Sequence, residues 1–417
     1  TLDAGGNVTG AVTLTGTLQT TGAADLDGDI NGSAAGTGVL DIDAATTVKD
    51  HVGNLHSISS VDVASGITLT LNPDGAAATY ATANGINLND DGTDNGTNTI
   101  LAFTTANGDV ITVNSAITTT TNKEGQITIS DSNGTVDFNG NVGTSTKALQ
   151  SVTFGANTNN VVTAAGNWYV DDTILDDNDV LRFDGTSAQV VGGTIHGAAA
   201  DDGHLIVGNT GTNSNVTFNG SVGVTNAAGA ATNTIEDFTV VSGSTAIFGG
   251  TAGTTTHRFS DDLVVDGTLR INQGISLRAQ DYVAGAATGS MDFVIGTVTA
   301  TGVDQSATLV LDTAVNWDNF DGTTANTTKA LLKQGTGVIL NGQDFRIVDG
   351  TGAVTNLAVA GETVADEYAL FNFKAYDGAT KAVGGSDNSD VVVEATHVRG
   401  EEVTGNRNNS EAADGIL

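Results

Sequence analysis

Turn-forming dipeptides interrupt this chain so often that long helices have little room. Asn-Gly occurs eight times and Asp-Gly ten times in 417 residues, or one pair for about every 23 residues. Both pairs readily adopt the positive backbone φ angle that tight turns between strands require. We therefore expect a chain of short strands joined by turns.

The runs between these turns alternate apolar with polar residues, which is the period of a half-buried strand. Clear examples are residues 39–43, 67–71, 126–129, 268–271 and 307–311. Shorter runs of β-branched residues lie between them. The pattern predicts an all-β protein.

Composition favours a β-solenoid over a sandwich or a closed barrel. A sandwich domain usually ends near 100–150 residues and fills its core with large aromatic side chains. This chain is much longer, and it has only two Trp and 55 Gly. A solenoid needs only a thin core of Val, Ile, Leu and Ala, with small or turn-forming residues at its corners. We therefore predict a parallel β-helix with a C-terminal β cap.

An internal repeat supports this fold. Residues 135–143 (TVDFNGNVG) recur 80 residues later as NVTFNGSVG, and a weaker third copy begins with the Val-Gly pair at Val52. From Met291 onward the repeat fades, and residues 368–376 gather four of the chain's few aromatic residues. We expect a solenoid body over residues 1–290, terminal coils and the cap over 291–400, and a polar tail over 401–417.

Charge and missing residue types exclude several classes of function. Asp and Glu number 48 against 14 Lys and Arg, for a formal charge of −34, so the chain lacks the basic surface that nucleic-acid binding requires. It has no Cys and therefore no disulfide, thiolate metal site or cysteine nucleophile. No apolar run is long enough to predict a transmembrane helix. Because it starts at Thr1 without a signal segment, we expect a processed, extracellular chain at the cell surface.

No catalytic motif is present. The chain contains neither Gly-x-Ser-x-Gly nor a phosphate-binding Gly-x-x-x-x-Gly-Lys, and its six His lack the spacing of a zinc protease motif. Parallel β-helices can carry glycan-cleaving sites built from Asp, Arg or Lys, but no pair stands out among 40 Asp. We predict that the protein is not an enzyme and requires no cofactor.

Two acidic clusters offer the oxygen ligands that Ca²⁺ takes. The first consists of Asp25, Asp27, Asp29 and Asn31. The second consists of Asp90, Asp91 and Asp94. The first departs from the EF-hand loop because Ile30 stands where glycine is needed. Each cluster is therefore either an optional Ca²⁺ site or an acidic turn.

Residues 136–154 and 216–240 each contain a strand, an Asn-Gly turn, a Val-Gly pair and a second strand. This arrangement resembles the passenger domains of autotransporters, in particular the outer-membrane-protein-B type that coats cells as a surface layer. Residues 307–398 are similar to the region that precedes the translocator barrel in that family. The resemblance implies a right-handed parallel β-helix, export to the cell surface, and a structural, adhesive or array-forming role.

These observations predict a non-enzymatic extracellular protein that self-assembles into a surface layer or filament on a bacterial cell. Its partners would then be its own copies and the bacterial outer surface. The alternative is an adhesin that binds glycans or proteins of host or neighbouring cells. Trp168, Tyr169 and Trp317 would be its contact residues unless they belong to the core. The acidic charge further predicts that assembly strengthens with salt or divalent cations.

Overall fold

The computed structural model describes most of the chain as far as residue 294. Gaps fall at residues 4–5, 76, 90–97, 105–107, 131–132, 156–158, 224–232, 252–254, 273–274, 280 and 285–289. Beyond residue 294 it describes five strands, namely Thr308–Leu311, Phe345–Val348, Val354–Asn356, Phe371–Asp377 and Val391–His397. The chain divides into two compact units, Thr1–Glu236 and Asp237–Leu417, which we describe separately.

The first unit is built from three parallel sheets. Sheet A has the order β1 (Val8–Thr9), β4 (Ala24–Asp27), β7 (Thr46–Val48), β9 (Thr68–Leu71), β12 (Ile100–Phe103), β15 (Gln126–Ile129), β17 (Leu149–Phe154), β19 (Trp168–Leu175), β21 (Ala188–Gly197) and β23 (Asn215–Phe218). Sheet B has the order β10 (Ala77–Tyr80), β13 (Val110–Val113), β16 (Thr135–Phe138), β18 (Val161–Ala164), β20 (Val180–Phe183) and β22 (Asp202–Val207). Sheet C has the order β14 (Ile117–Thr119), β11 (Ile86–Leu88), β8 (Ser60–Val63), β6 (Val39–Ile42) and β3 (Thr17–Thr20), and β2 (Val12–Leu14) pairs with β5 (Ile30–Gly32).

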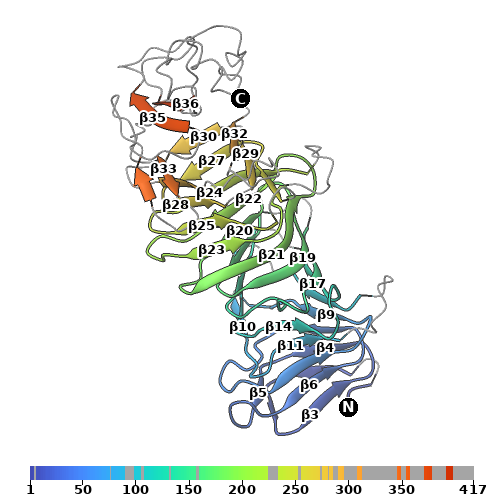
Figure 1. Cartoon of the computed structure of the whole chain (residues 1–417). Coiled ribbons are helices and arrows are strands. Elements are labelled where there is room, and N and C mark those ends of the chain that lie inside the picture. Colours follow the sequence, from blue (N-terminus) through green and yellow to red (C-terminus); the bar gives the residue numbers. More distant parts are fainter. Residues whose placement is uncertain are drawn as a thin grey trace, which may run out of the picture. The chain divides into compact units, whose positions relative to one another are not determined.

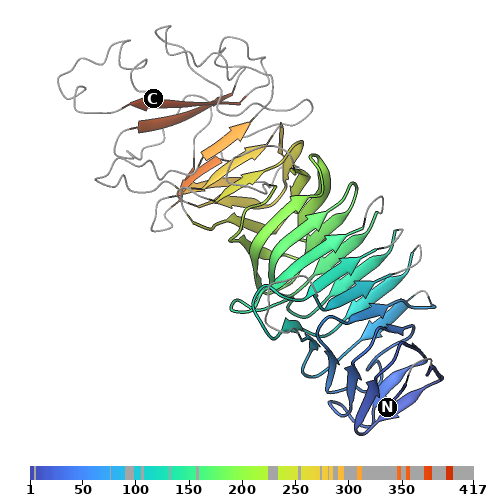
Figure 2. The same ribbon diagram turned by 90° about the vertical axis from the view of Figure 1, so that its right-hand side faces the viewer.

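From β9 to β14 the chain visits the three sheets in turn and then returns one strand further along each, and from β15 to β23 its strands alternate between sheets A and B. Thus β9, β10 and β11 lie in sheets A, B and C, and the next three strands repeat that order. Leu69 of β9 pairs in parallel with Leu101 of β12, which pairs in parallel with Ile127 of β15. Figure 1 labels the main strands, and Figure 2 shows neighbouring strands of the first unit side by side with their arrowheads pointing the same way. The predicted all-β parallel solenoid is confirmed, and no described residue is helical.

The core follows the period-two pattern of the sequence. In most strands alternate side chains are buried, as in β15, where Ile127 and Ile129 point inward. Larger rings stack from coil to coil at centroid distances of 5.4 to 6.1 Å, in the order Phe103, Phe138, Trp168, Phe183 and Phe218. Edge-to-face ring pairs of this kind add about 0.5–1.5 kcal/mol each beyond the burial of their area.

Trp168 belongs to this core. Its side chain is fully buried, and its Nε1–H donates to the hydroxyl of Thr173 at 2.9 Å. Tyr169 next to it is half-buried. Trp317 lies outside the described residues. The structure therefore shows that Trp168 is a core residue and not an exposed contact residue.

The repeated Val-Gly pair is a corner module. Its copies are Val52-Gly53, Val142-Gly143 and Val222-Gly223, and their glycines have φ angles of 68° to 72°. The valines form parallel bridges to Ile30, Ile117 and Ile195 of the preceding coil, and the glycine N–H groups donate to the carbonyls of the same three residues. These isoleucines lie on β5, β14 and β21, which belong to different sides of the solenoid. Equivalent residues of two repeat copies, 80 positions apart, therefore do not lie above each other along the solenoid.

The second unit continues with strands of the same kind. One sheet has the order β24 (Ile235–Val240, which begins in the first unit), β27 (Asp262–Val265) and β30 (Asp281–Ala284). A second has β25 (Thr245–Phe248), β28 (Thr268–Ile271), β31 (Ser290–Val294), β33 (Phe345–Val348) and β34 (Val354–Asn356), and a third has β26 (Thr256–Arg258), β29 (Ser276–Ala279) and β32 (Thr308–Leu311).

The last described strands of this unit depart from the parallel pattern. β33 pairs antiparallel with β34, and β35 (Phe371–Asp377) pairs antiparallel with β36 (Val391–His397). The strand β35 contains part of the aromatic run that the sequence assigns to the cap, whereas Tyr368 lies outside the described residues. The predicted boundaries at residues 290 and 400 stay predictions. Within the described part of the chain, no helix is long and apolar enough to cross a membrane.

Candidate functional site

The first predicted calcium cluster is spread over β4, β5 and the turn between them. Asp25 points outward from β4, and its carboxylate lies 3.6 Å from Lys49 Nζ. Asn31 is buried in β5, and its Oδ1 accepts the backbone N–H groups of Leu55 and His56 at 2.9 and 3.3 Å. The Asn31 oxygen therefore already holds a corner loop of the next coil.

The carboxylates of this cluster do not converge. Among the described residues, Asp25, Asp27 and Asp29 do not form a group of three with ligand atoms close enough for one ion. The second cluster, Asp90, Asp91 and Asp94, lies outside the described residues. Calcium binding at either place stays a prediction.

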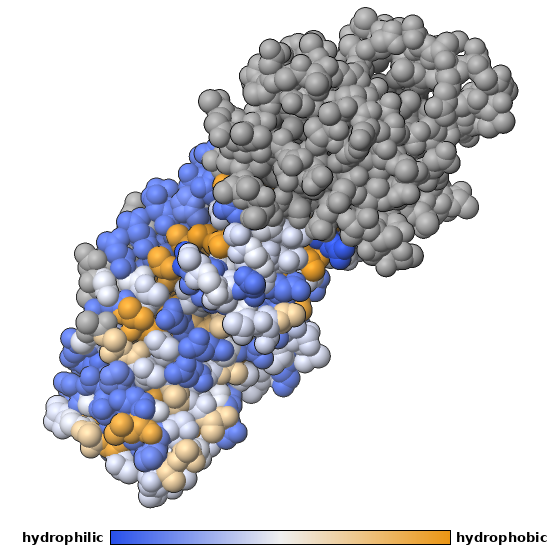
Figure 3. Space-filling model, turned by 90° about the vertical axis from the view of Figure 1, so that its left-hand side faces the viewer, coloured by the Kyte–Doolittle hydropathy of each residue, from blue (hydrophilic) through white to orange (hydrophobic). Residues whose placement is uncertain are grey.

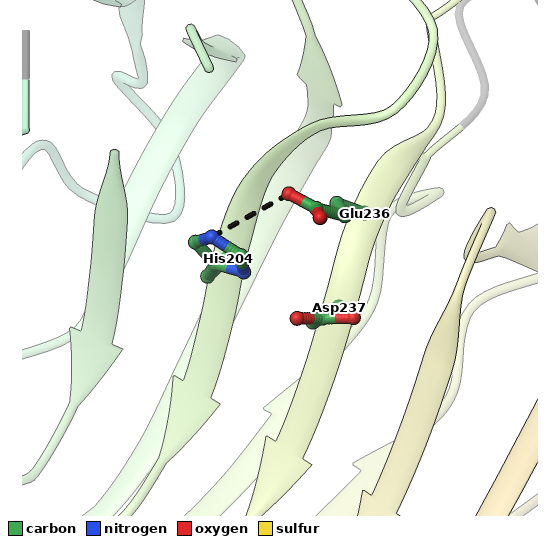
Figure 4. Close-up of side chains that lie close together, drawn as sticks. All are labelled: His204, Glu236 and Asp237. Atoms are coloured by element: carbon green, nitrogen blue, oxygen red, sulfur yellow. Dashed lines mark ion pairs between the residues drawn. The ribbon is translucent and has the colours of Figure 1, made fainter. Parts of the chain in front are cut away.

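One group of three possible metal ligands does occur within the described chain. His204 on β22 lies with its Nε2 3.5 Å from Glu236 Oε2 on β24, and Figure 4 shows the two side chains pointing toward each other. Asp237 is the next residue of β24, and ligand atoms of the three residues lie within 4.8 Å of one another. The ion pair accounts for the approach of His204 and Glu236, so we assign no metal here.

A second histidine is held between two acceptors. His196 on β21 has its Nε2 2.9 Å from Asp172 Oδ1 and its Nδ1 2.7 Å from the carbonyl oxygen of Gly197. Both oxygens are acceptors, so both ring nitrogens must carry a proton to satisfy them. Burial lowers the pKa of His196, but these two contacts outweigh it, and the net pKa is raised. The pair therefore stabilises the fold at low pH, and this contribution is lost as the pH rises through the raised pKa.

An uncharged surface covers the middle of sheet A. The outward-facing side chains of β7, β9, β12, β15 and β17 form it, and we call it the threonine face. Its members are Thr47, Thr68, Thr70, Ile100, Ala102, Gln126, Thr128, Gln150, Ser151 and Thr153. One row runs in register from coil to coil, in the order Thr47, Thr70, Ala102, Thr128 and Thr153. The residues of this row therefore lie at the strand spacing of about 4.8 Å.

The other two sheets carry charge on their outer faces. On sheet C, Asp41 and Asp62 are register partners, and burial followed by the carboxylates of Asp43 and Asp62 raises the pKa of Asp41. On sheet B, Asp137 and Arg182 point outward among half-buried valines. Within the described strands of the first unit, the threonine face is the longest run of neighbouring strands whose outward side chains are all uncharged.

The threonine hydroxyls of this face form no hydrogen bonds with other described residues. Thr47, Thr70, Thr128 and Thr153 have no side-chain hydrogen bond to any described residue. By contrast, Thr118 on sheet C donates to Asn87 Oδ1 at 2.6 Å, and Thr163 on sheet B donates to Asp137. The threonine face therefore offers donors and acceptors to water or to a partner.

Lysines stand at the border of this face. Residues 1–236 contain four basic residues, and three of them are Lys49, Lys123 and Lys147. Lys49 follows β7 directly, and the other two precede β15 and β17 by a few residues. Figure 3 shows one side of the molecule, on which apolar patches are small and separated by hydrophilic residues. The distinguishing property of the threonine face is that none of its outward side chains is charged.

Comparisons with protein family models, with curated proteins and with solved structures find no match to this chain. Function must therefore be argued from the geometry of the chain itself. The sequence predicted acidic clusters as candidate calcium sites, but the threonine face was not predicted from it. A signal was present, because the polar positions of runs such as 67–71 and 126–129 are Thr or Gln and not Asp.

Proposed function

We propose that this protein is a structural β-solenoid whose copies associate through the threonine face to build a surface layer or filament on a bacterial cell. The observation that carries the proposal is an uncharged, regular sheet surface on a chain whose formal charge is −34. The absence of a recognisable catalytic motif is compatible with such a role.

Charge decides which surfaces of two copies can approach. Contact through sheet C would place Asp41 and Asp62 of one copy near the carboxylates of the other. Each like-charge pair at about 4 Å costs about 1 kcal/mol even in water. Contact through the threonine face places no carboxylate of the five strands opposite another. Two of the three bordering lysines are already paired with carboxylates, Lys49 with Asp25 and Lys123 with Asp171, which leaves those parts of the border close to neutral.

The size of the threonine face limits the strength of one contact. Five strands spaced about 4.8 Å apart, with about 10 Å of each exposed, cover about 250 Å². A stable interface buries about 800 Å² per partner. One such contact is therefore weak, and a lasting assembly requires each copy to make several contacts in an array.

Charging the threonine face is expected to abolish assembly. We expect Thr128→Asp with Thr153→Asp to lower the association constant at least tenfold, because a face-to-face contact then gathers four carboxylates. Light scattering over a salt series measures this. The wild-type signal should increase with salt, as the screening length falls from about 30 Å at 0.01 M to about 8 Å at 0.15 M.

The matched control is Thr79→Asp with Thr135→Asp, which adds the same charge to the outer face of sheet B. The control is expected to assemble like the wild type. If both double variants lose association equally, net charge and not the threonine face governs assembly. If wild-type association weakens as NaCl is added, the proposed contact is wrong.

A further inference from the structure

A groove lies at the β4 end of the threonine face. It has a volume of about 340 Å³ and is open to solvent along one side. It is lined by Asn7, Asp25, Thr47, Thr68, Thr70 and a set of alanines from the start of β4 and the segment before β7. Ligand pockets of proteins start at about 300 Å³, which is enough for one small ring.

The polar groups in the groove are held in place but not fully used. The Asn7 Oδ1 accepts the backbone N–H of Asp25 at 3.1 Å, which fixes that side chain at the wall. Lys49 holds the Asp25 carboxylate from 3.6 Å. The hydroxyls of Thr47, Thr68 and Thr70 have no hydrogen-bond partner among the described residues. The groove thus presents three unused hydroxyls beside one oriented carboxylate.

The small side chains of the groove give it an apolar base. Ala24 is nearly buried, and Thr46 beside it is tied to Thr20 Oγ1 at 3.0 Å and to the carbonyl of Ala44 at 2.8 Å. This base cannot hydrogen-bond a ligand, and it suits the C–H surface of a ring. The rim can hydrogen-bond a ligand on several sides.

We propose that this groove binds one ring of a neutral carbohydrate. An anion would meet the Asp25 carboxylate and the negative potential of the whole chain. A bare cation would meet a single carboxylate that Lys49 already neutralises. An apolar ligand would bury three hydroxyls without partners, which is unfavourable. A neutral sugar presents hydroxyls that both donate and accept, together with an apolar ring face.

The affinity of such an open groove is low. Ligands of moderate size bind with about −0.3 kcal/mol per non-hydrogen atom, so a ring of about 12 such atoms corresponds to a dissociation constant in the millimolar range. Because Thr47, Thr68 and Thr70 also belong to the threonine face, contact between two copies through that face would cover the groove. Sugar binding and association through the face are therefore expected to compete. The groove is open in the unassembled chain, and sugar binding there does not depend on the proposed structural role.

Saturation-transfer NMR with glucose, galactose, mannose and N-acetylglucosamine tests this proposal on the full chain at low salt. At least one of the four sugars is expected to bind, with glucuronate binding more weakly. Thr47→Val with Thr70→Val should weaken binding at least tenfold, since valine keeps the shape but removes two hydroxyls. Thr128→Val, on the same sheet but outside the groove, should change it less than twofold.

Three results would overturn the carbohydrate proposal. The first is that none of the four sugars shows saturation transfer at about ten times the expected dissociation constant. The second is that the Thr47 and Thr70 double variant binds sugar as well as the wild type. The third is that glucuronate binds more tightly than every neutral sugar. Thermal unfolding of the valine variants shows whether they are folded. The aspartate variants at Thr128 and Thr153 probe assembly without touching the groove, so failure of one proposal leaves the other intact.

Discussion

Replacing Gly143 with alanine is expected to destabilise the protein by about 3 kcal/mol or more. Gly143 has a φ angle of 68°, and a Cβ atom there would lie 2.1 Å from the carbonyl oxygen of Tyr169 in the next coil. The left-handed conformation alone costs a side chain about 1–2 kcal/mol. The overlap adds to this because the obstacle is backbone. Urea unfolding followed by circular dichroism measures the loss.

Gly211→Ala is the matched control for this prediction. Gly211 also has a positive φ angle, of 87°, but apart from its two chain neighbours no described residue places an atom within 4 Å of a Cβ built there. It should therefore lose only the conformational part, about 1–2 kcal/mol. Equal losses in the two variants would show that the Val-Gly corner is not packed against the neighbouring coil as described.

Replacing His257 with leucine is expected to remove most of an acid-induced loss of stability. His257 lies on β26 in the second unit, is fully buried, and packs its ring 4.1 Å from that of Phe248. Burial lowers the pKa of His257 to about 3. Below about pH 6.5, the ordinary pKa of a histidine, His257 is therefore protonated in the unfolded chain but stays neutral in the folded chain. The folded state loses about 2 kcal/mol by pH 5 through this residue.

Thermal unfolding at pH 7 and pH 5 measures this loss. The wild type should lose more stability on acidification than His257→Leu, whereas His56→Leu, at an exposed histidine, should behave like the wild type. Carboxylates with a raised pKa, such as Asp41, shift stability in the opposite direction, but they do so equally in all three proteins. An identical acid response of His257→Leu and wild type would contradict the buried, neutral state of His257.

Much of the fold was predictable from the sequence because strands and turns here depend on residues that are close together in the chain. Alternation over 126–129 predicts the strand β15, the Asn-Gly turn at Asn139 predicts the end of the next strand, β16, and both occur. The long strands β19 and β21 were not predictable in full. Their pairing shifts register between Tyr169 and Asp172, and this irregularity depends on the neighbouring coil. The number of residues in each coil was not predictable either, because loops of different length join strands that still pair in register.

The candidate site was less predictable than the fold. Acidic clusters are visible along the sequence, but their carboxylates point to different places once Asp25 lies on β4 and Asn31 is buried in β5. The residues of the threonine face are instead far apart in the sequence and close together in the structure. Thr70 and Thr128 are 58 positions apart in the sequence, and only the parallel register through Ala102 brings them into one row. A surface of this kind becomes visible when strands are assigned to the same sheet.

Cysteine cross-linking tests the central claim, association through the threonine face, most directly. The chain has no Cys, so Thr128→Cys or Thr153→Cys introduces a single thiol on the threonine face, and Thr135→Cys introduces one on sheet B. With a short bis-maleimide at high salt, we expect covalent dimers from the Thr128 and Thr153 variants and only background from the Thr135 variant. Equal yields from the three variants, or a higher yield from Thr135→Cys, would contradict assembly through this face.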